Sequence, residues 1–99
     1  MDIIYASLHR RQQAAPEPAA EVAEVLGALW AHATPGDGLE HVTGRPEADR
    51  IDLLMYLATA TATRPVADAP CRAEALLTRC HDASPLLRRR YLPPRTATA

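Results

Sequence analysis

The densest apolar run in the chain covers residues 50–59 and directly follows a polar segment at 44–49. Apolar residues occupy both alternating sets of positions in this run, so periodicity alone fits either a buried strand or a helix. Alternating threonines follow the run, and β-branching disfavours a helix. The polar segment contains Gly and Pro, which is typical of a hairpin. The pattern therefore favours a strand at 50–59. A helix over 50–63 is the alternative, and it would make the protein a small all-α bundle.

Two further segments have the period of a strand. Residues 2–10 alternate in polarity and are rich in β-branched and aromatic side chains, which predicts a strand buried on one face. Residues 39–43 alternate in the same way and lie just before the polar segment. We expect 39–43 to pair with 50–59 as a hairpin.

Two segments carry apolar residues at the spacing of a helical face, and both have a proline in the predicted first turn. The first covers 18–33, and its predicted apolar face includes Trp30. The second covers 69–83, with Asp68 as the N-cap. A short helical extension is expected at 86–92, after a serine cap and a proline.

The predicted order of elements is β-α-β-β-α, in a single α+β domain at 1–94 that is followed by a flexible tail at 95–99. A right-handed crossover makes the first two strands parallel, and the third strand can lie between them as an antiparallel centre. This order resembles a ferredoxin-like (split β-α-β) domain that lacks its last strand and has its helices on one face of the sheet. The resemblance rests on element order alone and implies no activity.

A central strand that is apolar on both sides implies an apolar surface on both faces of the sheet. The helices cover one face, and an open apolar face is typical of a contact surface. The first strand is also expected to be an unprotected edge. The sequence therefore predicts a homodimer through the open face or this edge. The candidate interface residues are Ile3, Tyr5, Leu54 and Tyr56, with Leu53 and Met55 as the alternative pair if the central strand faces the other way.

The charge pattern contains one basic cluster. The net charge is −1, and all eleven basic residues are arginine. With so much Ala and Pro, this indicates the codon bias of bacterial-type GC-rich DNA more than phosphate binding. Arg88, Arg89 and Arg90, next to Tyr91, are further interface candidates that fit an acidic protein surface. Since the net charge creates no overall attraction to polyanions, a nucleic-acid partner is disfavoured, and a DNA-associated regulator is the third hypothesis.

Candidate chemistry is sparse. No histidine pair has metal-ligand spacing and no glycine loop opens a helix, so we expect neither a metal nor a cofactor. His9, His41 and Tyr56 are candidates for a ligand cleft on the open sheet face, as in small cofactor-free ferredoxin-like enzymes. Cys71 lies near a predicted helix N-terminus, which lowers a thiol pKa, but a small packing residue is the favoured interpretation over a reactive thiol.

These features together predict a small non-catalytic interaction module with an accessory or regulatory role. The alternative is a cofactor-free ligand binder or enzyme of the monooxygenase or cyclase type in a biosynthetic pathway. The first residues have neither the charge nor the apolar length of a secretion signal, and no apolar stretch approaches a membrane span. We therefore expect a cytoplasmic protein that does not enter a membrane.

Overall fold

The computed structural model describes residues 1–12, 17–61 and 66–97. The strands are β1 (Asp2–His9), β2 (Leu39–Pro46), β3 (Arg50–Leu57) and β4 (Arg95–Ala97). The helices are α1 (Pro18–His32), the 3-10 turn η1 (Pro35–Asp37), α2 (Ala69–Ala83) and α3 (Pro85–Arg90). The α+β class is confirmed, and the all-α alternative is wrong because the apolar run forms β3. None of the described helices is long and apolar enough to cross a membrane.

The strands form one sheet in the order β2-β3-β1-β4. β3 lies between β1 and β2 and pairs antiparallel with both, which is the central place that the sequence predicts for it. This order of strands and helices is compatible with a ferredoxin-like arrangement. It gives the long strands one face for a core and one face without helices.

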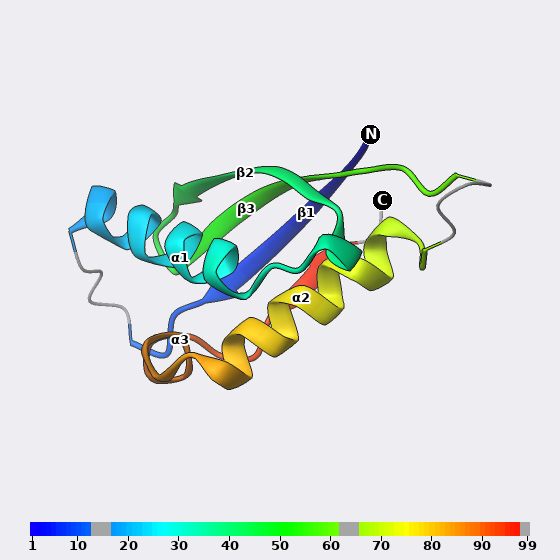
Figure 1. The fold of residues 1–99 in the computed structure, drawn as a ribbon. Coiled ribbons are helices and arrows are strands. Elements are labelled where there is room, and N and C mark those ends of the chain that lie inside the picture. The colour runs from blue at the N-terminus through cyan, green and yellow to red at the C-terminus, as the bar shows by residue number, and fades with distance from the viewer. Residues whose placement is uncertain (13–16, 62–65, 98–99) are drawn as a thin grey trace.

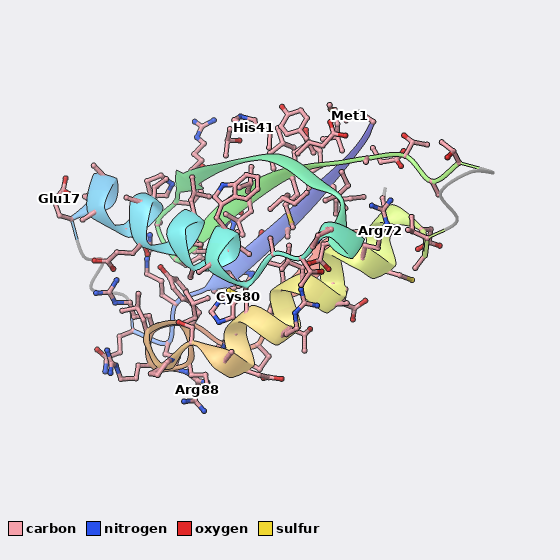
Figure 2. The ribbon with its side chains drawn as sticks, viewed as in Figure 1. Met1, Glu17, His41, Arg72, Cys80 and Arg88 are labelled. Atoms are coloured by element: carbon pink, nitrogen blue, oxygen red, sulfur yellow. The ribbon has the colours of Figure 1, made fainter. Side chains whose placement is uncertain are left out.

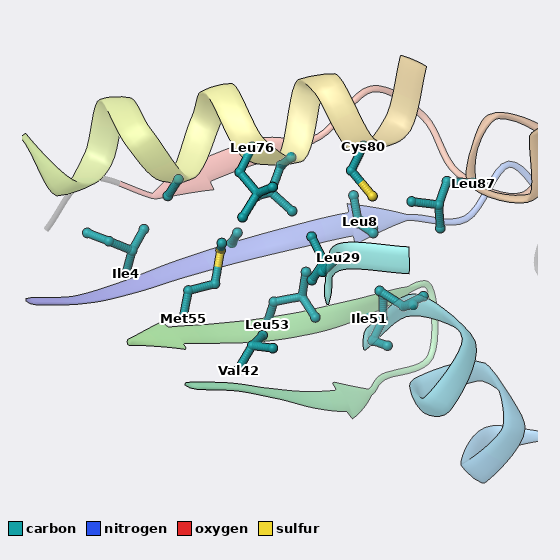
Figure 3. Close-up of a cluster of buried hydrophobic side chains, with 14 of the residues drawn as sticks. Ile4, Leu8, Leu29, Val42, Ile51, Leu53, Met55, Leu76, Cys80 and Leu87 are labelled. Carbon is teal, nitrogen blue, oxygen red and sulfur yellow. The ribbon is translucent and has the colours of Figure 1, made fainter. Parts of the chain in front are cut away.

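Helices α1 and α2 lie on the same side of the sheet, and the hydrophobic core fills the space between these helices and the sheet (Figures 1 and 3). Every second residue of β3 is buried there. The buried set on this strand is Ile51, Leu53, Met55 and Leu57. Because side chains alternate across a strand, Leu54 and Tyr56 must face away from the helices. The orientation that puts Leu53 and Met55 on the open face is therefore wrong.

A fourth strand, absent from the predicted order, lies at the end of the chain. β4 pairs antiparallel with the middle of β1, so β1 is not the unprotected edge that the sequence predicts. The predicted tail at 95–99 includes β4, and residues 98 and 99 lie outside the described residues. The chain reaches this position because the Leu92 N–H donates to the His9 carbonyl, which aligns the segment after α3 with β1.

Helix α1 buries a narrower stripe than predicted. Its buried residues are Glu21, Val25 and Leu29, each four positions from the next. Trp30 is 47% exposed, contrary to the prediction, because it is one position and about 100° around the helix from Leu29. The predicted caps of the later helices are confirmed. Asp68 accepts from the Cys71 N–H, and Ser84 accepts from the Leu87 N–H at the start of α3.

Candidate functional site

The sheet face opposite the helices has an apolar half. Ile3 is paired with Tyr56 across β1 and β3, and Tyr5 is paired with Leu54 in the next outward-facing row. Ile3 and Tyr5 are 52% and 61% exposed, and their β3 partners are partly exposed. The apolar half of the open face, as we call these four residues, is continuous because cross-strand neighbours are in contact range.

β2 extends these two rows with more polar residues. His41 is paired with Tyr56 and Thr43 with Leu54. The rings of His41 and Tyr56 are tilted against one another, with their centroids 5.4 Å apart. Figure 2 shows His41 and Met1 on the side of the sheet away from the helices.

The other half of the open face is polar and its charges are paired. The Ser7 hydroxyl and the Arg50 Nε both donate to Asp52 Oδ1, each at 2.8 Å. Burial alone would raise the pKa of the Asp52 carboxyl, but these two donors outweigh it and lower the pKa. Arg50 also donates to Asp49 at 2.9 Å, and Arg45 forms an ion pair with Glu47 at 3.2 Å. This half therefore presents neutralised charges.

The three candidates for a ligand cleft are not gathered into one site. His41 and Tyr56 are in contact, whereas His9 is paired with Arg50 at the opposite end of β3. Arg50 is six positions before Tyr56 along the strand, which is about 20 Å. A hollow of about 490 Å³ lies between the two halves of the face, with walls that include Tyr5, Leu54 and Asp52. Its described lining contains none of the three candidates.

The arginine cluster is divided between solvent and ion pairs. Arg88 and Arg89 are exposed at the end of α3, and Arg90 forms an ion pair with Glu24 of α1. Tyr91 does not belong to this surface, because it is fully buried. Burial and the hydrogen bond to Glu21 raise the pKa of its hydroxyl.

A buried polar network connects β1, α1 and the segment after α3, and sequence reasoning missed it. Glu21 is fully buried and accepts from Arg10 Nε and Nη2 at 2.8 and 2.7 Å. It also accepts from the Tyr91 hydroxyl at 2.6 Å. The Arg10 hydrogen bonds, opposed by burial, lower the pKa of the Glu21 carboxyl. His81 Nε2 lies 3.0 Å from the Tyr91 carbonyl oxygen and extends the network to α2.

The histidines and cysteines lie on several elements, and Cys80 Sγ is 3.9 Å from His32 Nδ1. Within the described residues, no group of three or more His, Cys, Asp and Glu side chains could hold a metal ion. Cys71 and Cys80 are free thiols, exposed and buried respectively. Contrary to the prediction for Cys71, its hydrogen bond with Asp68 raises the pKa of the thiol. Burial raises the pKa of Cys80 to about 11.

Comparison with protein-family models, with curated proteins and with solved structures finds no match for this chain.

Proposed function

We propose that the protein is a small non-catalytic interaction module, accessory or regulatory to other proteins, that self-associates through its open sheet face. The observation that carries this proposal is the exposure of Ile3 and Tyr5 in continuous rows with Leu54 and Tyr56. Large apolar side chains gathered on one face, opposite a core that is already filled, favour burial against a partner.

The dimensions of the face set the size of the contact with a second copy of the chain. Strands of eight residues extend for about 26 Å, and β1, β2 and β3 together are about 14 Å wide. This outline has an area of roughly 360 Å², about half of the roughly 800 Å² that each partner buries in a standard interface, so side chains at the border of the face would have to supply the rest. A ferredoxin-like arrangement, with which this fold is compatible, leaves the whole face free for such packing.

The two apolar rows are complementary to one another. One row has Ile3 on β1 and Tyr56 on β3, and the other has Tyr5 on β1 and Leu54 on β3. A two-fold axis between the rows and across the strands places each tyrosine over an aliphatic side chain of the second copy. The paired charges around Asp52 then lie toward the rim, where polar groups remain hydrated.

The test measures solution mass by sedimentation equilibrium at micromolar concentrations. We expect a dimer for the native chain and a monomer for Tyr5→Glu, because a carboxylate at the centre of the interface would be desolvated without a partner. The matched control is Trp30→Glu, which introduces the same charge at another exposed aromatic, on α1. It should remain dimeric. A monomeric native chain, or a Tyr5→Glu variant that dimerises as tightly as the native chain, contradicts the proposal.

A further inference from the structure

A second surface lies at the α3 end of the molecule. A groove of about 700 Å³ runs between the end of β1 and the chain that follows α3. Its walls include Arg11 and His9 on one side and Leu92, Pro93 and Pro94 on the other. Leu92 is 44% exposed, so the groove offers an apolar contact as well as polar ones.

Positive charge lies in and next to this groove, since Arg11 lines it and Arg88 and Arg89 are in the last turn of α3, which Arg11 contacts. Arg11, Arg88 and Arg89 are exposed, and the Arg11 Nε donates to the Arg88 carbonyl at 2.9 Å, which places the two residues together. Over the described ranges, no carboxylate forms an ion pair with these three side chains. The neighbouring Arg10 and Arg90 are neutralised by Glu21 and Glu24. The excess charge is therefore local, in a chain whose net charge is −1.

We propose that this surface binds an acidic segment of another protein that carries an apolar side chain. Carboxylates of the segment would accept from the guanidinium groups of Arg11, Arg88 and Arg89, which are suited to that geometry. Its apolar side chain would pack on Leu92. The arginines indicate that the partner is acidic, and the exposed Leu92 indicates that it also carries an apolar side chain.

The same residues argue against a nucleic acid as the occupant. Tyr91, adjacent to the arginines in sequence, is buried and cannot stack on a base. Asp49 lines the groove, but its carboxylate is paired with Arg50. The unpaired charge is that of three arginines in a chain whose net charge is −1, which is too local to follow a phosphate backbone. The surface is also separate from the apolar half of the open face, since Arg88 lies on the helix side of the sheet and His41 on the other (Figure 2). Asp49, at the edge of the polar half, is shared with the groove. The inference therefore stands whether or not the proposed dimer forms.

The experiment uses the full chain and a dye-labelled peptide of alternating glutamate and leucine, with binding followed by fluorescence anisotropy. Two comparison peptides replace glutamate with glutamine or leucine with glycine. Labelled duplex DNA is the third comparison probe. The variant is the triple Arg11→Ala, Arg88→Ala, Arg89→Ala, and circular dichroism checks its fold. Arg89→Ala alone serves as a second variant if the triple does not fold. Arg45→Ala is the matched control, because it removes an exposed arginine from the open sheet face.

We expect the triple variant to bind the glutamate–leucine peptide about tenfold more weakly, since each exposed arginine–carboxylate contact changes affinity by about 1.5- to 5-fold. Arg89→Ala should show one such step, and Arg45→Ala none. Both comparison peptides should bind more weakly than the parent peptide. Equal binding of the glutamine peptide, no loss in the arginine variants, or tighter binding to duplex DNA that the triple variant abolishes would each overturn the proposal.

Discussion

Glu21 is a charged residue that lies in the interior of the protein. It is a fully buried carboxylate, and Arg10 and Tyr91 satisfy it with three hydrogen bonds. Replacing it by glutamine leaves the Arg10 guanidinium, whose side chain is 4% exposed, without a counter-charge. We expect Glu21→Gln to lower the free energy of unfolding by about 3–5 kcal/mol, the range for breaking one partner of a buried ion pair. Urea unfolding followed by circular dichroism measures this.

The control for this prediction is Glu24→Gln on the same helix. Glu24 makes an ion pair with Arg90 in which both side chains are partly exposed, at 42% and 33%. Such pairs contribute about 0–1 kcal/mol. Similar losses in the two variants would show that burial does not distinguish the two pairs, which would contradict the prediction.

For single residues, the periodicity of helices and strands identifies buried positions that polarity alone does not. Glu21 stands four residues before Val25 and eight before Leu29, so helical spacing alone places it on the buried stripe. Arg10 lies two residues after the buried Leu8 of β1, so the alternation of a strand points both side chains to the same face. Charged side chains are rarely buried, so polarity alone would place both residues at the surface. Their partner Tyr91 lies 70 residues from Glu21, and local periodicity cannot identify a pairing at that separation.

Among the elements, the junction of η1, β2 and β3 depends on one glycine. Gly38 ends η1 with φ of 68°, the left-handed region that L side chains rarely adopt. A Cβ there would lie 2.7 Å from Arg72 Nη1. That guanidinium donates to the carbonyls of Ala67, Asp37 and Ala58, and so connects the N-terminal end of α2 to η1 and to the segment after β3.

We therefore expect Gly38→Ala to be destabilising, by about 1–2 kcal/mol from the backbone alone and more through displacement of Arg72. Gly36→Ala is the matched control in the same turn, where the nearest atom to a new Cβ is Thr34 Oγ1 at 3.9 Å. It should change stability by less than about 0.5 kcal/mol. Thermal unfolding of the two variants checks the pair, and equal melting temperatures would contradict the role given to Gly38.

The long elements could be predicted because each has a local cause. Alternation marks β1, and the spacing of apolar residues together with Asp68 and Pro70 marks α2. β4 could not be predicted in the same way. It has three residues, and it is a strand because the segment after α3 runs beside β1, which is a long-range contact. The sequence predicts a flexible tail from residue 95, whereas the strand begins at that residue.

For the whole molecule, the sheet separates two surfaces with different chemistry. The apolar run at 50–59 suggested a surface on the open face, and the burial of alternate β3 residues assigns Leu54 and Tyr56 to it. The groove beside Arg11 was not foreseen, because its walls come from β1 and from the chain after α3. A dimer through the open face would carry two such grooves, so the two proposals together describe a module able to join two acidic segments.

The pH dependence of stability also belongs to the whole molecule, because the shifted groups lie in different elements. Arg10 lowers the pKa of Glu21, and for Asp37 the hydrogen bonds from Thr34 and Arg79 outweigh burial and lower the pKa. A lowered folded-state pKa stabilises the protein above the unfolded value, about 4, and this stabilisation is lost as the pH falls toward the folded value. Burial raises the pKa of Cys80 to about 11, so its contribution is lost as the pH rises from about 8.5 toward 11.

We therefore expect the urea midpoint to be flat between about pH 5 and pH 8.5 and to fall on both sides. Asp37→Asn should reduce the slope on the acid side, and Cys80→Ala should reduce the slope on the alkaline side without changing the acid one. The two variants act as controls for one another, since Asp37 lies in η1 and Cys80 in α2. A midpoint that rises below pH 5, or a Cys80→Ala variant whose alkaline slope equals that of the native chain, would contradict this assignment.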